Sequence, residues 1–199
     1  MDENTQNHTA VNGEPVPNPA GDRVIVLVGL MGAGKTTVGR RLANRLDIPF
    51  VDADAEIEAA AGMTIPEIFA QHGEQHFREG ERKVIARLLQ QNGGMLATGG
   101  GAFMDPETRA QIKRDGVSVW LRADVGLLLK RVARRNNRPL LKQGDPAEIM
   151  TRLRDERYPV YAQADITVDS TDAPHEEIVD AIITALQGYF SDPHHQADR

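Results

Sequence analysis

The segment GLMGAGKT, at residues 29–36, carries the strongest chemical pattern in the sequence. It matches G-x-x-x-x-G-K-[S/T] and directly follows the apolar, β-branched run VIVLV at 24–28, where a buried strand would turn into a helix. There, successive main-chain N–H groups and a helix N-terminus can face a phosphate. Lys35 would reach the β- and γ-phosphates, and the Thr36 hydroxyl would ligate Mg²⁺. The expected phosphate-binding residues of a purine nucleoside triphosphate site are Gly32, Ala33, Gly34, Lys35, Thr36 and Thr37.

Two carboxylates follow the short apolar stretch at 49–52. In FVDADAEIE, residues 50–58, Asp52 and Asp54 stand two positions apart and would face the same way if the strand continued. One would help to hold the water shell of the metal, and the other would accept the proton of a substrate hydroxyl. The alternative is structural, with Asp54 serving as the N-cap of the next helix.

Two separated arginines suggest a carboxylate on the second substrate. Arg78 follows the apolar Phe77 in GEQHFREGER, and Arg157 precedes Tyr158 in RDERYPVY. A guanidinium group can bind a carboxylate through two parallel hydrogen bonds, so a pair of arginines would anchor an acidic substrate firmly. Taken singly, each arginine could equally be a solvated surface residue.

A basic run at 130–145 contrasts with the acidic balance of the chain. Its basic residues are Lys130, Arg131, Arg134, Arg135, Arg138 and Lys142, and no acidic residue occurs in the run before Asp145. An exposed helix end would explain two or three of them, because cations favour a helix C-terminus. We expect the rest to form a mobile lid, at about 131–146, that closes on the triphosphate and supplies an arginine to the transferred group.

Three consecutive glycines end the apolar run in LATGGGAF, residues 96–103. Many phosphate-loop enzymes carry a metal-binding aspartate near this place. Here no carboxylate follows Thr98, so Asp52 is expected to be the acid on the metal side. We expect a ligand to approach the bare main chain of these glycines closely, at Gly100 and Gly101, whereas a flexible turn is the alternative.

The remaining pattern predicts the elements that would position these residues. Apolar runs at 24–28, 49–52, 95–98, 117–121 and 165–168 alternate with helical segments, several of them opened by Thr or Asp caps at 64, 105, 124 and 145. This is the pattern of a three-layer α/β/α fold with a five-stranded parallel sheet, in which ligands bind beyond the carboxyl ends of the strands. Gly73 is expected to interrupt the helix that begins after Thr64. The last helix is expected to start near Pro174.

The composition fits one globular domain. The chain has 199 residues and a net charge of −6, which argues against a nucleic-acid partner, and it contains no cysteine. No apolar run approaches the roughly 20 residues that span a bilayer, so we expect a cytoplasmic protein without a membrane partner. Residues 1–22 and 191–199 are polar and are expected to be disordered tails around a domain at 23–190.

In sequence order, these motifs resemble the shikimate kinase family over residues 23–187. The shared elements are GLMGAGKT, FVDAD, the FR of EQHFREGE, ATGGG, RPLL and ERYPVY. The resemblance implies a nucleoside-monophosphate-kinase-like fold with a mobile lid. It also implies transfer of the γ-phosphate of ATP to the 3-hydroxyl of shikimate with Mg²⁺, and we expect the enzyme to be a monomer. Two alternatives stay open: the same fold with another acceptor, such as gluconate or a nucleoside monophosphate, or a nucleotide-binding module without catalysis.

The resemblance also implies a role for each matched residue. Asp54 would hydrogen-bond the reacting hydroxyl, and Asp52 would lie near the metal. The shikimate carboxylate would bind to Arg78 and Arg157, and the rest of the substrate would contact the segment 53–82 together with Gly100 and Gly101. Arg138 would reach the phosphates from the lid, and Arg131 would pack against the adenine. Catalysis would therefore rest on Lys35, Asp54 and Arg138.

Overall fold

A central sheet of five parallel strands forms the middle layer of the structure, a computed structural model that describes residues 15–133 and 144–193. The strands are β1 (Val24–Val28), β2 (Phe50–Asp52), β3 (Met95–Ala97), β4 (Gly116–Arg122) and β5 (Ile166–Asp169), in the spatial order β2-β3-β1-β4-β5. All five residues of β1 are buried, as expected for a central strand covered on both faces. The predicted α/β architecture is thus confirmed, with strand bounds within about two residues of those expected.

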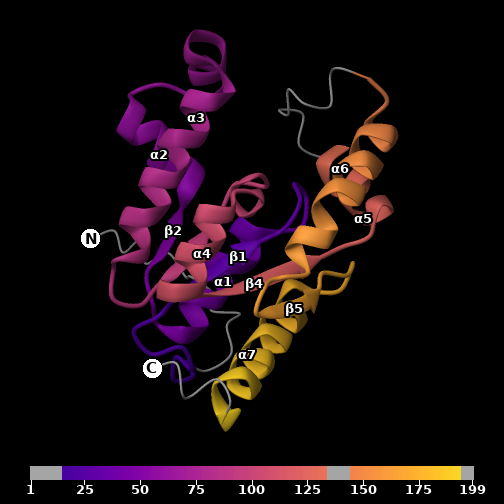
Figure 1. Cartoon of the computed structure of the whole chain (residues 1–199). Coiled ribbons are helices and arrows are strands. Elements are labelled where there is room, and N and C mark those ends of the chain that lie inside the picture. The colour runs from indigo at the N-terminus through magenta and orange to yellow at the C-terminus, as the bar shows by residue number, and fades with distance from the viewer. Residues whose placement is uncertain (1–14, 134–143, 194–199) are drawn as a thin grey trace, which may run out of the picture.

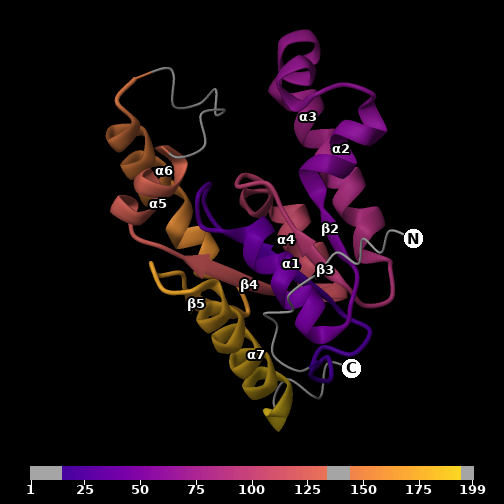
Figure 2. The same cartoon turned by 180° about the vertical axis from the view of Figure 1, so that it is seen from behind.

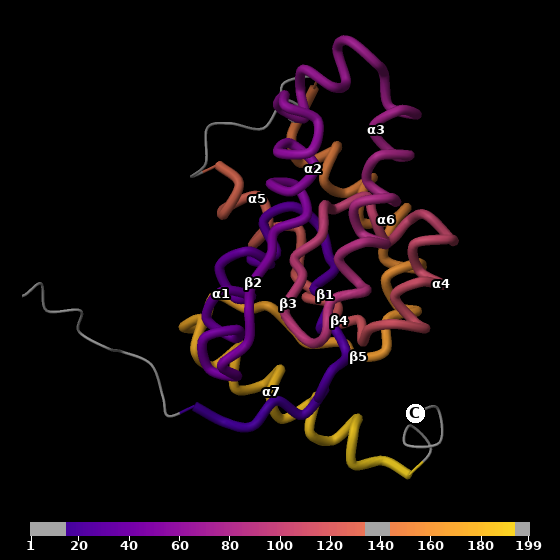
Figure 3. The backbone as a smooth tube through the Cα atoms, turned by 90° about the vertical axis from the view of Figure 1, so that its left-hand side faces the viewer, coloured from indigo at the N-terminus to yellow at the C-terminus, as the bar shows by residue number. Residues whose placement is uncertain are grey.

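Helices cover both faces of this sheet (Figures 1 and 2). Helices α1 (Lys35–Leu46) and α7 (His175–Ser191) pack against each other on one side. On the other side lie α4 (Pro106–Asp115), the C-terminal part of α3 (Ile65–Leu89) and α6 (Pro146–Tyr161), as the side view shows (Figure 3). Helix α2 (Ala53–Ala61) packs on α3, and α5 (Val125–Ala133) packs on α6. The two pairs rise above the carboxyl ends of the strands, where they can flank a ligand (Figure 1).

The predicted helix starts are confirmed by their caps. Thr64 forms a complete capping box with Glu67, and the carboxylates of Asp105 and Asp145 accept from the first turns of α4 and α6. Asp124 accepts from the N–H of Leu127 at 2.9 Å. These caps satisfy main-chain donors that a helix leaves unpaired at its N-terminus.

One expectation about local structure needs correction, and another is confirmed. Asp54 is not an N-cap, because β2 ends at Asp52 and the Asp52 side chain itself caps α2 by accepting from the Asp54 N–H at 3.1 Å. The expected interruption at Gly73 is confirmed, because Gly73 adopts φ 80° and ψ 174°, outside the helical region, and a second, longer helical stretch of α3 follows it to Leu89. A glycine can take this left-handed value without the steric cost that a side chain would add.

The N-terminal segment is also more ordered than the sequence suggests. Residues 15–22 pack on the domain, with the Val16 N–H donating to the Arg45 carbonyl at 2.9 Å and Ala20 buried in the core. The expectation of a disordered tail is therefore wrong for residues 15–22, and residues 1–14 lie outside the described part of the chain. In the described ranges, no helix is long and apolar enough to cross a membrane.

Candidate active site

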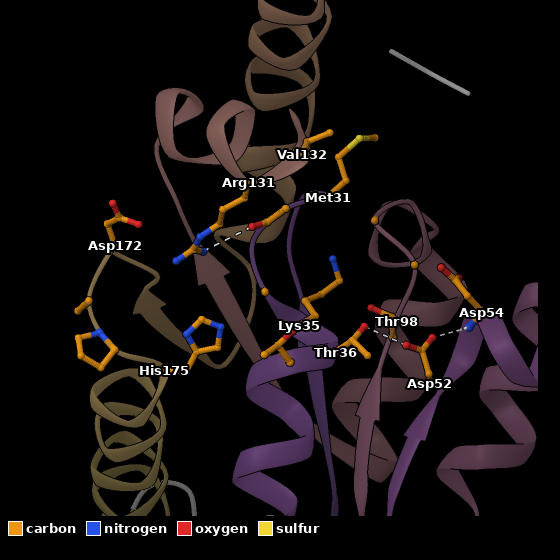
Figure 4. A pocket seen from close by; sticks show the side chains of 17 residues that line it. Met31, Lys35, Thr36, Asp52, Asp54, Thr98, Arg131, Val132, Asp172 and His175 are labelled. Carbon is orange, nitrogen blue, oxygen red and sulfur yellow. Dashed lines mark hydrogen bonds between the residues drawn. The ribbon is translucent and has the colours of Figure 1, made fainter. Parts of the chain in front are cut away.

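A cavity of about 620 Å³ lies at the carboxyl edge of the sheet. Arg131 and His175 lie toward one end, Asp52 and Asp54 toward the other, and Lys35 stands between them (Figure 4). The predicted residues that line it are Gly32, Gly34, Lys35, Thr36, Thr37, Asp52, Asp54, Gly100 and Arg131. Residues 172–175, at the start of α7, also line it, and the sequence analysis did not single them out for the site.

The phosphate loop is wedged between the end of β4 and helix α5. A side chain on Gly29 would lie 2.8 Å from the Leu121 carbonyl, and one on Gly32 would lie 2.9 Å from the Val132 side chain. Both glycines also have positive φ values, 141° and 83°. The loop is thus held in one shape by the core, with the N-terminus of α1 behind it, which is the arrangement that binds phosphate.

The Lys35 ammonium group lies over this loop. It donates to the carbonyl oxygens of Gly29 at 2.7 Å and Leu30 at 3.1 Å. These contacts hold the charge at the place where the terminal phosphates of a triphosphate would arrive. Main-chain carbonyls are neutral acceptors, so an arriving phosphate, which is charged, forms the stronger hydrogen bond with Lys35.

A hydroxyl and a carboxylate meet beside the loop. Thr36 Oγ1 donates to Asp52 Oδ2 at 2.9 Å, and Oδ1 of the same carboxylate caps α2. Within the described residues, no group of three or more His, Cys, Asp or Glu side chains could hold a metal by itself. Mg²⁺ fits this pair nonetheless, because it is commonly bound by one or two protein oxygens together with water and substrate phosphates.

The residues that are expected to bind the phosphoryl acceptor lie around the glycine segment, residues 99–101, which follows β3. A side chain on Gly99 would lie 2.8 Å from Asp54 Oδ1, and one on Gly101 would lie 2.6 Å from Arg78 Nη1. Arg157 Nη1 donates to the Gly100 carbonyl at 2.9 Å. The structure therefore brings Asp54, Arg78 and Arg157 together around the three glycines, although they come from α2, α3 and α6.

Glu81 is a buried carboxylate in this group that the sequence analysis missed. It is 2% exposed, and Arg78 Nη1 donates to its Oε2 at 2.7 Å. Burial raises the pKa of Glu81, against the opposing effect of Arg78, and the carboxylates of Asp54 and Asp105 raise it further. Burial alone would lower the pKa of Arg78, but Glu81 and Glu74 outweigh it and the pKa is raised. The three-residue spacing of Arg78 and Glu81 on a helix is the signal that would have indicated this pair.

Arg131 projects from α5 toward the opposite end of the cavity. Its Nη1 donates to Ser170 Oγ at 2.8 Å, and its Nη2 donates to the Thr171 carbonyl, which ties α5 to the loop before α7. Burial lowers the pKa of this guanidinium group, with Asp172 and Asp124 opposing the effect. Arg138 and most of the predicted lid lie outside the described residues.

Comparisons with known proteins agree with this geometry. Residues 31–187 match the family model "Shikimate kinase". A shikimate kinase of Rhodopseudomonas palustris is 60% identical over 170 residues, covering 85% of this chain and 84% of that protein. The solved structure of shikimate kinase from Acinetobacter baumannii in complex with shikimate has a TM-score of 0.80 and 40% identity, covering 83% of this chain and 93% of that one.

A gluconokinase structure from Sinorhizobium meliloti is similar at the level of the fold alone, with a TM-score of 0.62 and 18% identity over 89% of this chain and 99% of that one. The phosphate loop, the converging arginines and the extent of the sequence match point to a single assignment. The chain belongs to the shikimate kinase family.

Proposed function

We propose that this kinase transfers the γ-phosphoryl group of ATP to the 3-hydroxyl of shikimate, giving shikimate 3-phosphate and ADP. The observation that carries the proposal is the convergence of one carboxylate and two arginines on bare glycine main chain, next to a phosphate loop. An acceptor with a hydroxyl near Asp54 and a carboxylate near Arg78 and Arg157 fits this distribution of charge.

Phosphoryl transfer depends on positioning and on neutralising charge, and the residues divide these tasks. The phosphate loop and Lys35 hold the triphosphate, and Asp54 orients the acceptor hydroxyl and takes its proton as the bond to phosphorus forms. Arg78 and Arg157 hold the far end of the acceptor, so its hydroxyl stays in line with the phosphoryl group.

Mg²⁺ would be held by Thr36 directly and by Asp52 through water. Bound there, the metal would supply positive charge that offsets the negative charge developing on the transferred phosphoryl group. We further propose that Arg138 reaches the phosphates from the lid and that Arg131 packs against the adenine. The monomeric state and the cytoplasmic location stay predictions.

The glutamate contacts of Arg78 indicate how an acceptor carboxylate would bind. Its Nη1 is paired with the buried Glu81, whereas its Nε and Nη2 make longer contacts, 3.4 Å and 3.3 Å, to the exposed Glu74. The weaker, solvated contact is the one that an acceptor carboxylate can replace.

An acceptor panel tests the proposal. Purified protein is incubated with ATP, Mg²⁺ and, separately, shikimate, gluconate or a nucleoside monophosphate, and ADP release is measured with and without EDTA. Among the three acceptors, we expect only shikimate to support rapid ADP formation, and we expect EDTA to abolish it. Turnover with gluconate instead would mean that the enzyme has the same fold but uses a different acceptor. ATP binding without turnover of any acceptor would favour a module that has no catalytic activity.

A further inference from the structure

The carbonyl oxygen of Gly100 is a meeting point for two donors from one helix. Arg157 Nη1 donates to it at 2.9 Å, and the Tyr161 hydroxyl donates to it as well. The donors stand four residues apart at the C-terminal end of α6, so they lie on the same face of the helix. A carbonyl oxygen has two lone pairs, and these two hydrogen bonds use both of them.

Tyr161 is built into the core around this contact. Its side chain is fully buried, and its ring lies beside those of Trp120 and Phe103, with centroid separations of 5.9 Å and 6.4 Å. Burial raises the pKa of the Tyr161 hydroxyl to about 12, with Arg157 opposing the effect, so the group stays protonated and remains a donor at physiological pH. Tyr161 is therefore a rigid support that reaches the glycine segment from behind.

The position of the Gly100 carbonyl matters for the acceptor site. A side chain on Gly100 would lie 3.6 Å from the Gly29 carbonyl oxygen and 3.7 Å from the Met31 nitrogen, so a methyl group there would be in van der Waals contact with the phosphate loop. Because a peptide group is planar, fixing this carbonyl also fixes the direction of the N–H of Gly101. Gly101 is the residue that packs against the Arg78 guanidinium group.

We propose that Tyr161 is a positioning residue for the acceptor. Its hydroxyl fixes the Gly100 carbonyl, and through that carbonyl it sets the places of the glycine segment and of Arg157. Arg157 then needs only one terminal nitrogen for this contact, and the rest of its guanidinium group can bind an acceptor carboxylate. The inference rests on the proposed function and adds a residue that does not touch the substrate.

Tyr158 offers a matched control on the same helix. Its hydroxyl also donates to a main-chain carbonyl, that of Ala123, and its ring also packs on Trp120, with centroids 4.8 Å apart. Ala123 follows β4 and is remote in sequence from the glycine segment. Tyr158→Phe and Tyr161→Phe therefore each remove one hydroxyl from the same aromatic cluster, but only the second removes a contact to Gly100.

The experiment measures KM for shikimate, KM for ATP, kcat and Tm for both variants. We expect Tyr161→Phe to raise the KM for shikimate about 3- to 10-fold, as the loss of one buried hydrogen bond would, and to leave the KM for ATP unchanged. We expect Tyr158→Phe to leave both KM values unchanged. An unaltered shikimate KM in Tyr161→Phe, an equal rise in both KM values, or the same shikimate effect in Tyr158→Phe would overturn the inference.

Two further measurements test the shared contact at Gly100 directly. Trp120 is the one tryptophan of the chain and its ring lies near that of Tyr161, so a change in its fluorescence on addition of shikimate would measure binding independently of turnover. In a double-mutant cycle, Tyr161→Phe is combined with Arg157→Lys. The rise in the KM for shikimate in the double variant should be smaller than the product of the two single-variant rises, because both residues act through Gly100. Effects that multiply would contradict the shared contact. If the wild-type protein does not use shikimate, the proposed function fails, and the same variants are measured with the acceptor that it does use.

Discussion

The two ends of the site use different groups of the chain to bind their ligands. The nucleotide end is mostly main chain, with a glycine loop pressed against β4 and α5 so closely that side chains on Gly29 or Gly32 would collide with Leu121 or Val132. The acceptor end is mostly charged side chains, which stand on three helices and hold one another through contacts such as the Arg78–Glu81 ion pair. Both ends meet where β1 and β3 run side by side.

This difference separates a general task from a specific one. Main-chain N–H groups recognise any phosphate, and they need only a fixed backbone, which the core provides. Side chains on α2, α3 and α6 define one acceptor by the positions of its hydroxyl and its carboxylate. Substitutions at the nucleotide end should therefore disturb the fold and the phosphates together, whereas those at the acceptor end should change selectivity in a folded protein.

The sharpest test of this contrast is Asp54→Asn. Removing the charge that orients the hydroxyl should lower kcat about 10²- to 10⁴-fold, because general-base assistance is lost. The variant should keep its Tm and its affinity for ATP, measured by calorimetry. Turnover close to the wild-type rate would remove Asp54 from the mechanism.

Asp52→Asn serves as the comparison for that variant. Asp52 caps α2 and contacts Thr36, so this change should lower Tm and raise the Mg²⁺ concentration needed for half-maximal activity. If the two variants behaved alike, the assignment of one carboxylate to the metal and the other to the acceptor would be wrong.

Arg78→Lys should have the next largest effect. A lysine keeps the charge but loses the two-pronged geometry, so the KM for shikimate should rise about 10- to 100-fold with little change in the KM for ATP. Arg82→Lys is the control, because Arg82 lies one turn further along α3 and pairs with Asp105 at 3.1 Å. Equal steady-state effects of the two changes would place the carboxylate site elsewhere.

Gly101→Ala should raise the KM for shikimate roughly 10-fold, the size expected for losing a hydrogen bond to a charged group. Gly101 has φ −99°, which alanine can adopt, and the new methyl group would meet only the movable end of Arg78, at 2.6 Å to 2.8 Å. The fold should therefore survive while the arginine shifts. Gly80→Ala, with no neighbour within 4 Å, should leave the kinetics unchanged. If the KM for ATP rose by the same factor, the glycines would form a turn and would have no specific role in binding the acceptor.

Glu74→Gln should improve the acceptor end slightly. If an incoming carboxylate must displace Glu74 from Arg78, removing that charge should lower the KM for shikimate about 2- to 3-fold, the worth of a solvated ion pair. Glu79→Gln, five residues further along α3, is the control. An increase in the KM for shikimate in Glu74→Gln would mean that Glu74 supports the site.

The smallest predicted effect concerns pH and the nucleotide end. Burial, together with Arg41 and Arg131, lowers the pKa of His175 below its ordinary 6.5, while Glu176 opposes the shift. The unfolded chain therefore binds a proton more readily, so this contribution to stability is present above pH 6.5 and is lost as the pH falls below it. His175→Asn should reduce the fall in Tm between pH 7.5 and 5.5. His72→Asn should keep the wild-type fall, and an unchanged fall in His175→Asn would contradict the assignment.

The features that could be predicted best from the sequence are those that depend on residues close together in the chain. The strands, the caps and the phosphate loop each depend on neighbouring residues, and their order is enough to place them on a parallel sheet. Tyr161 could not be placed in the same way, because its role comes from a contact with the distant Gly100, whereas Glu81 could have been indicated by its three-residue spacing from Arg78. Residues 15–22 look like a disordered tail by composition, but the contacts of Val16 and Ala20 hold them on the domain.

The close approach of Gly100 to Gly29 and Met31 has a practical consequence for inhibitor design. A single methyl group on Gly100 would already contact the Gly29 carbonyl oxygen and the Met31 nitrogen, so the glycine segment and the phosphate loop lie close together at this point. A compound that joins a phosphate mimic to a carboxylate-bearing ring therefore needs only a short linker to occupy both substrate sites. A resistance substitution that places a larger residue at Gly100 would crowd Arg157. Such a variant should therefore also bind its own substrate less tightly.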